Sequence, residues 1–412
     1  MSIRIGRTLP PAVAPIGLGN VVHGLFAILQ GNKAQQSFSD QLKEYFKVKH
    51  CFLLSSGKAS LALILQSIKE QHPEKDEVLI PAFTCYSVPA AIIRAGLKIR
   101  ICDIEPETLD FDYDELTKHL SAPNLLCVIP THLFGVTADV PRVREILGNR
   151  DITLVEDAAQ AMGGEYLGHR VGTLGDVGFF SLERGKPFST VEGGVIITNS
   201  DELAVVIKSH IDELPSYTFF EQLLLASYAI VISVFSHPEL FWFPRSLPFL
   251  GLGETHYAPN FSIKRMSAFQ AGLARGWKDR LNQFIQARRR NADRFYRSGI
   301  ISAGGGLPHT NDLIRYPIMV SSKGEKQSIL LESNCFGLGL ADVYPDTVDC
   351  IEGLRGRDII GDATKARSII ERMITLPIHP YVTESDMERI IPLVRKAGDF
   401  VVGRNLEKSK EA

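Results

Sequence analysis

Between residues 50 and 200, short apolar runs alternate with segments in which apolar residues recur at helical spacing. This alternation is typical of a mainly parallel sheet covered by helices. The pattern predicts strands over 77–81, 98–103, 125–130, 153–156, 177–181 and 194–198. An apolar helix is expected over 88–95, ended by Gly96, and another over 60–70, opened by the turn Ser55-Ser56-Gly57.

The second part of the chain has its own pattern. Apolar residues at helical spacing predict one long helix over 266–297, followed by a short strand over 315–320 and helices over 325–333 and 384–397. Because 412 residues exceed the size of a single hydrophobic core, two domains are expected. We predict a large α/β domain over 1–262 and a smaller C-terminal α/β domain over 263–412.

One segment of the predicted large domain, 217–252, is unusually apolar. Residues 222–238 contain no Asp, Glu, Lys or Arg, and the aromatic cluster Leu240-Phe241-Trp242-Phe243 follows. Pro238 and Pro244 interrupt the segment, which is too short for a bilayer span of about 20 apolar residues. It is interpreted either as a buried helix at a subunit interface or as a hydrophobic lid or shallow membrane-surface contact, which would matter for a lipid-linked substrate.

Composition narrows the class of protein. Apolar residues make up 45% and charged residues 22%, as in an ordinary globular enzyme, and a net charge of −2 argues against nucleic-acid binding. None of the six cysteines forms a C-x-x-C pair, which favours buried thiols in a reducing cytosol. Residues 1–15 do not have the pattern of a secretory signal. We therefore expect a cytoplasmic protein, peripheral to the membrane if 217–252 contacts it.

Two predicted strands end in residues that carry chemistry. Residues 153–156 lead to Asp157, at the strand edge where ligands gather in open α/β sheets. A carboxylate there is also compatible with magnesium binding, a helix cap or a salt bridge. The strand 177–181 leads to a polar turn with one lysine, Lys186. Pyridoxal phosphate needs an amine for a Schiff base, an acid beside its ring nitrogen and donors for its phosphate.

The order of the motifs resembles that of the DegT-type sugar aminotransferases, a family of fold-type I pyridoxal-phosphate enzymes. The resemblance covers about residues 38–391. It rests on seven segments in the family's order: Ser55-Ser56-Gly57-Lys58-Ala59-Ser60-Leu61, 76–84, Pro130-Thr131-His132-Leu133-Phe134-Gly135, Glu156-Asp157-Ala158-Ala159-Gln160-Ala161, Gly172-Thr173-Leu174-Gly175-Asp176, 265–271 and Leu376-Pro377-Ile378-His379-Pro380. The resemblance implies a large, mostly parallel mixed sheet flanked by helices, with a smaller C-terminal α/β domain.

The resemblance also implies roles around the cofactor ring. Lys186 would form the Schiff base and then move the proton between the α-carbon and the cofactor. Asp157 would pair with the ring nitrogen, and Gln160 would donate to the phenolic oxygen. His132 would be a catalytic neighbour of the cofactor, although a structural histidine also fits its position. No metal ligand is implied.

The phosphate site and the ring contacts depart from the family's pattern. The amides of Ser56, Gly57 and Lys58 would hold the phosphate together with Ser181, but Lys58 stands where the family usually has a threonine. Cys85 occupies the position of the aromatic residue that stacks on the cofactor, so Tyr86 would take that part or the stacking would be lost. Ile263 stands where the family usually has an asparagine, two positions before Arg265. Around the lysine, Glu183-Arg184-Gly185 also differs from the family's common pattern.

These features predict a transaminase that takes an amino group from an amino acid such as glutamate and passes it to a keto sugar linked to a nucleotide. The resemblance implies a homodimer. One alternative is a pyridoxal-phosphate-dependent sugar dehydratase, against which Lys186 argues because a histidine usually replaces the lysine there. Another is a non-catalytic cofactor-binding protein that joins a membrane assembly through 217–252. The sequence identifies neither the sugar nor the nucleotide.

Overall fold

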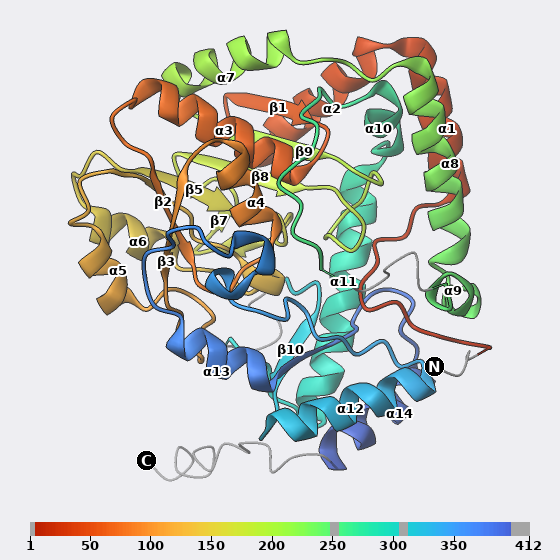
Figure 1. Cartoon of the computed structure of the whole chain (residues 1–412). Coiled ribbons are helices and arrows are strands. Elements are labelled where there is room, and N and C mark those ends of the chain that lie inside the picture. Colours follow the sequence, from red (N-terminus) through yellow and green to blue (C-terminus); the bar gives the residue numbers. More distant parts are fainter. Residues whose placement is uncertain (1–4, 248–254, 305–311, 397–412) are drawn as a thin grey trace.

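The computed structural model describes residues 5–247, 255–304 and 312–396, and a seven-stranded sheet forms its centre (Figure 1). The order of the strands is β1-β9-β8-β5-β4-β2-β3. Their bounds are β1 (His50–Leu54), β2 (Glu77–Pro81), β3 (Lys98–Cys102), β4 (Leu125–Val128), β5 (Thr153–Asp157), β8 (Val177–Ser181) and β9 (Gly194–Thr198). A separate short hairpin joins β6 (Glu165–Tyr166) to β7 (His169–Arg170).

The sheet is mixed, as predicted. Strands β3, β2, β4, β5 and β8 run parallel to one another, whereas β9 is antiparallel to β8 and β1 is antiparallel to β9. The predicted strands all occur, and β2, β8 and β9 have the predicted bounds. The sequence did not predict β1, because only its last residue, Leu54, is buried and the strand shows no clear alternation of apolar and polar positions.

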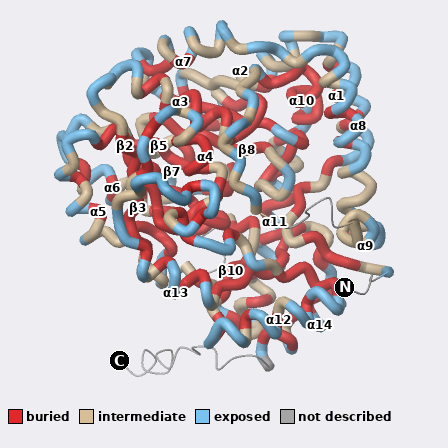
Figure 2. Tube along the Cα trace, viewed as in Figure 1, coloured by how far each residue is buried: buried red, intermediate tan, exposed pale blue. Residues whose placement is uncertain are grey.

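Helices cover both faces of the sheet, and the buried residues are concentrated in and beside it (Figure 2). Val78 and Ile80 pack into one core cluster and Leu79 into another, because successive side chains of a strand point to opposite faces. One face is covered by α3 (Gly57–Gln71), α4 (Ser87–Arg94) and α7 (Asp201–Glu213), and the other by α2 (Asn32–Phe46), α5 (Tyr113–His119), α6 (Val140–Leu147) and α11 (Trp277–Arg297).

The C-terminal part contains its own antiparallel pair, β10 (Tyr316–Met319) and β11 (Met373–Leu376). Around it lie α12 (Lys323–Phe336), α13 (Thr364–Arg372) and α14 (Glu384–Lys396); position 397 of the predicted last helix is outside the described residues. The start of the chain packs here, since Arg7 pairs with Asp386 at 2.7 Å. The division between residues 262 and 263 stays a prediction.

The long helix expected over 266–297 is wrong: the structure has two helices, α10 (Ala268–Leu273) and α11. Gly276 adopts a left-handed φ of 68° and breaks the backbone path between them. Ser267 caps α10 and forms a capping box with Gln270. The apolar spacing continues across the break, which is why periodicity alone did not reveal it.

The apolar segment 217–252 forms α8 (Phe219–Phe235) and α9 (Pro238–Arg245), and its positions 248–252 lie outside the described residues. Helix α8 lies beside α1 (Leu18–Gln30) (Figure 1). Within the described chain, only Leu225, Ala226 and Ala229 of α8 are buried. No single described helix is long and apolar enough to cross a bilayer; α8 and α9 together are, but they bend by 117° between them.

Candidate active site

The predicted site lies where the parallel strands of the sheet end. Asp157 is the last residue of β5, and it pairs with Phe179 of the neighbouring β8, which ends two positions later at Ser181. Thr131, just after β4, forms a parallel bridge with Asp157. The loop from β8 to β9 carries Lys186. The carboxyl ends of three adjacent strands therefore place these residues at one edge of the sheet.

Asp157 is a buried acid close to the candidate lysine. Only 3% of the residue is exposed, and its Oδ1 accepts a hydrogen bond of 3.0 Å from the amide of Ala159. Burial raises the pKa of Asp157, whereas the Ala159 amide and the positive charge of Lys186 act to lower it. The charge of Lys186 thus acts on the Asp157 carboxyl, while the joint role predicted for the two residues stays a prediction.

Arg288 of α11 holds the loop between β8 and β9, which carries Lys186 and is called the lysine loop. Its Nη1 donates to the carbonyl of Pro187 at 3.0 Å and its Nη2 to that of Lys186 at 3.4 Å. Burial lowers the pKa of Arg288 to about 10. These bonds hold the backbone of Lys186, so its side chain starts from a defined position.

Further along the loop, Val191 adopts a left-handed φ of 74°. This conformation is strained for a β-branched residue and persists only where the surroundings impose it. Val191 is buried in a cluster with Ile16, Leu225 and Phe269, from the segment before α1, from α8 and from α10. The packing of these helices therefore reaches the loop that carries Lys186.

The turn before α3 has the features of an anion site. Ser56 caps the helix, and its Oγ accepts from the amide of Ala59 at 3.2 Å. The amides of Gly57 and Lys58 have no acceptor among the described residues. A Cβ added to Gly57 would lie 2.6 Å from the Cβ of Ser181, so glycine lets the turn approach the end of β8. Free amides at a helix N-terminus attract a phosphate.

The side chain of Lys58 points toward an aromatic ring, with its Nζ 4.9 Å from the ring centroid of Phe261. Its charge also lowers the pKa of Glu192, which burial raises. The ammonium of Lys58, in the first turn of α3, thus lies near the Phe261 ring and close enough to Glu192 to act on its carboxyl. Its predicted contact with a phosphate, like the one predicted for Ser181, stays a prediction.

Glu156 is a buried structural carboxylate beside Asp157, and the sequence interpretation gave it no role. Its Oε2 accepts from the amides of Leu174 and Gly175, at 2.7 and 2.9 Å, and its Oε1 accepts from Gly172. The motif 172–176 is thus a turn wrapped around this carboxylate. Its signal in the sequence was an acidic residue directly before Asp157 in an apolar strand.

Glu156 also holds His132. The ring Nε2 of His132 lies 2.9 Å from Oε1 of Glu156, and its Nδ1 accepts from the amide of Ala138 at 3.0 Å. The proton therefore resides on Nε2, and both ring nitrogens are engaged within the protein. This arrangement favours a positioning role for His132, whose backbone amide donates to the carbonyl of Asp157 at 3.1 Å.

Gln160 faces a residue that the sequence interpretation missed, Tyr344 from the C-terminal part. The Nε2 of Gln160 donates to the Tyr344 hydroxyl at 3.4 Å, and its Oε1 accepts from the amide of Phe134 at 3.3 Å. Burial raises the pKa of Tyr344, and the neighbouring Cys85 raises it further. Arg315, also missed, lies close enough to act on Tyr344 through its charge. Periodicity gave no signal for either residue.

Tyr86, the suggested replacement for the stacking ring, is turned toward the same segment. Its hydroxyl accepts from the amide of Asp346 at 3.1 Å, and its ring centroid lies 6.3 Å from that of Tyr344. Cys85 is half-buried beside it. Both positions border the site, but the stacking role assigned to them stays a prediction.

The residues present fit pyridoxal phosphate. The site combines a lysine, a buried acid and free amides at a helix N-terminus, which match the three needs of the cofactor. The hydroxyl of Thr84, after β2, is buried at the same edge of the sheet and has no hydrogen-bond partner among the described residues. Unpartnered buried donors are rare in folded proteins and indicate a place for a polar ligand.

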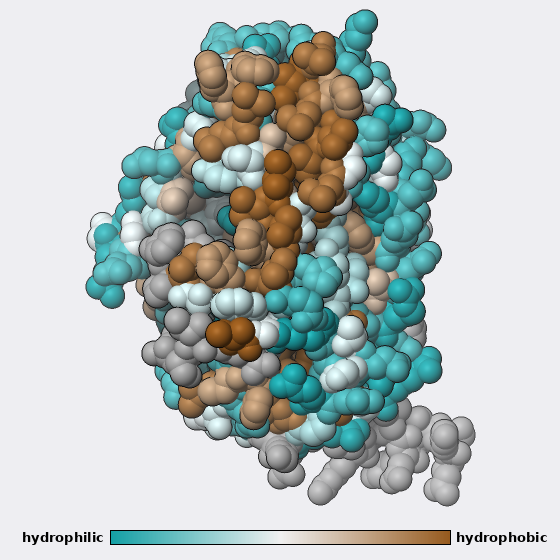
Figure 3. All heavy atoms as spheres, turned by 90° about the vertical axis from the view of Figure 1, so that its right-hand side faces the viewer, coloured by the Kyte–Doolittle hydropathy of each residue, from teal (hydrophilic) through white to brown (hydrophobic). Residues whose placement is uncertain are grey.

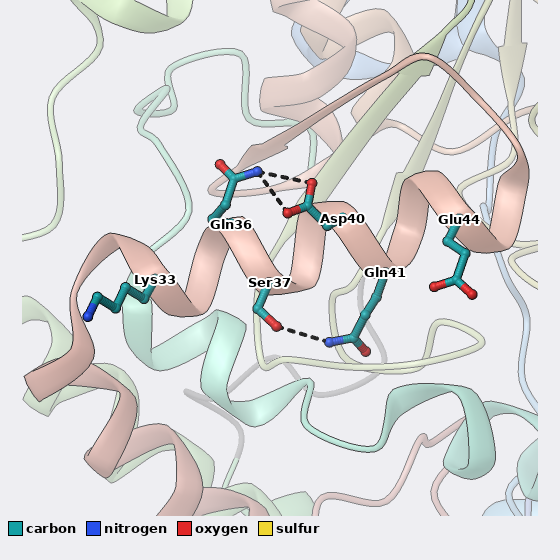
Figure 4. Close-up of a pocket in the computed structure, with 6 residues that line it drawn as sticks. All are labelled: Lys33, Gln36, Ser37, Asp40, Gln41 and Glu44. Atoms are coloured by element: carbon teal, nitrogen blue, oxygen red, sulfur yellow. Dashed lines mark hydrogen bonds between the residues drawn. The ribbon is translucent and has the colours of Figure 1, made fainter.

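A hollow of about 500 Å³ on the outside of α2 is unrelated to this site (Figure 4). It is lined by polar residues of that helix alone. Gln36 donates to Asp40 at 3.0 Å and Gln41 to Ser37 at 3.2 Å, both across one helical turn. These bonds are typical of a solvated helix face.

Known proteins share both the sequence and the fold. The sequence model described as the DegT/DnrJ/EryC1/StrS aminotransferase family matches residues 21–223, which include the phosphate turn, Asp157 and Lys186. The chain belongs to this family. A family relative, the L-glutamine:2-deoxy-scyllo-inosose aminotransferase of Streptomyces kanamyceticus, is 34% identical over 171 residues, which are 42% of the chain and 39% of the relative. The chain thus spans about two fifths of the length of the first curated relatives it matches.

Solved structures establish the fold of this family member over its whole length. DesI, solved with its TDP-sugar product, has a TM-score of 0.75 and 19% identity, covering 100% of this chain and 96% of DesI. The E. coli GDP-4-keto-6-deoxy-D-mannose-3-dehydratase, solved with hydrated PLP, has a TM-score of 0.71 and 17% identity, covering 95% of this chain and 100% of the other. The chain therefore has the fold-type I architecture, as predicted.

Proposed function

We propose that this protein is a pyridoxal-phosphate-dependent aminotransferase that moves an amino group from an amino acid, with glutamate as donor, to a keto sugar linked to a nucleotide. The observation that carries the proposal is that the buried Asp157 ends β5 beside β8, whose following loop carries Lys186, so that the charge of Lys186 acts on the Asp157 carboxyl. Family membership supports it. When bound, pyridoxal phosphate supplies an electron sink for the α-carbon of the amino acid.

Each of the chain's own site residues has a separate role around pyridoxal phosphate. Asp157 keeps a proton on the ring nitrogen, because a buried carboxylate beside it strongly favours the charged form. Lys186 would hold the aldehyde of the cofactor through Nζ, and the same amine would move a proton at the α-carbon. Gln160 would hold the phenolic oxygen. The amides of Gly57 and Lys58 would bind the phosphate at the N-terminus of α3, together with Ser181.

A sugar dehydratase is the second candidate, since an enzyme with that activity shares this fold. Lys186 favours transamination, because the resemblance associates dehydration with a histidine at that position. Product analysis separates the two, since only transamination converts glutamate to 2-oxoglutarate. A homodimer and a cytoplasmic location belong to the proposal as well. None of the six cysteines forms a disulfide in the described part of the chain, which supports a reducing compartment. Light scattering tests the dimer.

The Lys186→Ala variant tests the proposal directly. The wild-type protein, loaded with pyridoxal phosphate, should absorb visible light, and borohydride should fix the cofactor to the peptide that contains Lys186. The variant should lose this covalent attachment and its half-reaction with glutamate, because Lys186 is the lysine whose charge acts on the Asp157 carboxyl. A purified wild-type protein that never takes up pyridoxal phosphate would contradict the proposal.

The Gly57→Ala variant tests the phosphate turn. The added Cβ would lie 2.6 Å from the Cβ of Ser181, so the turn must move away from β8. Overpacking of about 1–3 kcal/mol predicts that the Kd for pyridoxal phosphate rises by about 5- to 150-fold. The matched control is Gly324→Ala in the first turn of α12, where nothing lies within 4 Å of the added Cβ. Equal affinities of the two variants would argue against this phosphate site.

A further inference from the structure

The exposed sides of α1, α8 and α9 form one continuous apolar surface, which we call the apolar face. In Figure 3 it appears as a broad hydrophobic band along the side of the molecule where these helices lie. Its members are the exposed large apolar residues of the three helices: Leu18, Val22, Leu25, Phe26, Leu29, Phe219, Phe220, Leu223, Leu224, Tyr228, Ile230, Val231, Leu240 and Phe243. Exposed patches of this extent mark an interaction surface.

The apolar face carries almost no charge. Helix α1 has no Asp, Glu, Lys or Arg in its 13 residues. The carboxylates of α8 and α9, Glu221 and Glu239, are paired with Lys264 and Arg7 at 2.5 and 2.7 Å. Leu29 and Phe220 are nevertheless 82% and 80% exposed. Water therefore contacts side chains that gain about 1.5–3 kcal/mol each when they are fully buried.

The inner sides of the same helices are packed into the protein. Leu225 and Ala229 of α8 belong to the core cluster that also contains Val21 of α1 and Phe269 of α10. Gly24 of α1 lies so close to Phe269 that an added Cβ would be 2.7 Å from its ring. The helices are thus held flat along the molecule, and the bend of 117° between α8 and α9 keeps them from forming one span. Only their outer side is free to meet a partner.

Cations border the apolar face. Arg275 donates to His23 of α1 at 3.2 Å, Lys33 lies in the first turn after α1, and Arg265 donates to Ser216, just before α8, at 2.7 Å. None of the three has a carboxylate within 4.0 Å in the described part of the chain. Unpaired basic groups beside an apolar surface complement anionic lipid headgroups, each contributing about 1 kcal/mol near the membrane.

Aromatic residues stand at both ends of the apolar face. Phe219 and Phe220 begin α8, and Trp242 and Phe243 lie in α9. Trp in particular prefers the boundary between headgroups and acyl chains. The match to the family ends at residue 223, so α9 and most of α8 lie beyond the segment that defines the family. Half of the apolar face, Leu18 and the six members from Leu224 onward, therefore lies outside the matched segment.

We propose that the apolar face docks on the surface of a lipid bilayer, with α1 and α8 lying in the boundary between headgroups and acyl chains. The charge-free helix α1, the single paired carboxylate of α8, the flanking cations and the terminal aromatic residues are the features of an interfacial contact. The face lies behind the lysine loop, because Val191 packs between α8 and α10. Docking therefore places the candidate site close to the membrane. The proposal does not depend on the reaction that the site performs.

Vesicle flotation of the full chain tests the proposal. The wild-type protein should float with vesicles of phosphatidylcholine mixed with phosphatidylglycerol, and less with phosphatidylcholine alone. The double variant Leu29→Glu, Phe220→Glu should bind at least about tenfold more weakly, because each substitution removes buried apolar area and adds a charge. The matched control is Val205→Glu, Leu331→Glu, on α7 and α12, where the residues are 71% and 68% exposed. It should bind as the wild type does.

The fluorescence of Trp242 gives a second measurement of membrane contact. It is made on the wild-type protein, so it does not depend on whether the Glu variants fold. Brominated phospholipids should quench its fluorescence, while Trp277, which is fully buried, stays unquenched. The quenching should disappear in Trp242→Phe. The absence of both flotation and quenching in the wild type would overturn the proposal. So would a dimer in solution that the Glu variants split into monomers without any lipid binding, since the occupant would then be a second copy of the chain.

Discussion

The Asp157→Asn variant should retain the fold and lose most of its catalytic rate. Asparagine has nearly the same shape, and its oxygen can still accept the hydrogen bond that Ala159 donates at 3.0 Å. The variant lacks the negative charge that favours a proton on the cofactor nitrogen. Breaking one buried ion pair costs about 3–5 kcal/mol, which corresponds to a fall of roughly 10²- to 10⁴-fold in rate.

The measurement is a single-turnover reaction of the loaded enzyme with glutamate, followed by the visible absorbance of the cofactor. Covalent attachment to Lys186 should survive in Asp157→Asn, since the lysine is unchanged, and this separates the variant from Lys186→Ala. A single-turnover rate close to that of the wild type would show that Asp157 does not face the ring nitrogen.

The variant Glu156→Gln, at the neighbouring position, should lower the stability of the protein and have little direct effect on the catalytic rate, whereas Asp157→Asn should lower the rate and retain the fold. Glu156 is fully buried, and its two oxygens accept from Gly172, Leu174, Gly175 and the His132 ring. The amide nitrogen of glutamine would face donors where an oxygen now accepts. Because buried donors would lose their partners, the free energy of unfolding should fall by about 2–4 kcal/mol.

Chemical denaturation of the two proteins measures this change. The control is Glu165→Gln, the same substitution in the hairpin β6–β7, where the side chain is exposed and pairs with Arg170 only at 3.4 Å. An exposed pair contributes about 0–1 kcal/mol, so the control should unfold much like the wild type. If Glu156→Gln were as stable as Glu165→Gln, the turn 172–176 would not depend on the Glu156 carboxylate.

These two acids show what sequence patterns can and cannot predict. Asp157 and Lys186 were singled out because each follows an apolar strand, and strand ends in a parallel sheet meet at one edge. Their roles were predicted from the resemblance to the sugar aminotransferases. Glu156 was passed over because the pattern of a strand does not say which of two adjacent acids faces a ligand. Only the contacts of its two oxygens, made with a turn 16 to 19 positions later, identify it as structural.

The residues that sequence reasoning missed come from distant parts of the chain. Tyr344 reaches Gln160 across 184 positions, and no local periodicity records such a contact. The break at Gly276 was hidden because the apolar spacing continues on both sides of it. The sequence showed that the segment 217–252 is unusually apolar. It did not show which side of the helix faces outward, because that required knowing that Leu225 and Ala229 are buried.

The pairing of β1 with β9 has a consequence for how the protein is made. His50 pairs with Thr198, so β1 has no neighbour in the sheet until β9 has left the ribosome. At roughly 5–20 residues per second, the roughly 150 residues between them take about 7 to 30 s to synthesise. During this time the nascent chain exposes an unpaired strand next to an apolar helix, which is the kind of surface that chaperones bind. Ser56 and Gly57 follow β1 directly, so the phosphate turn should reach its final shape only after Lys186 has been translated.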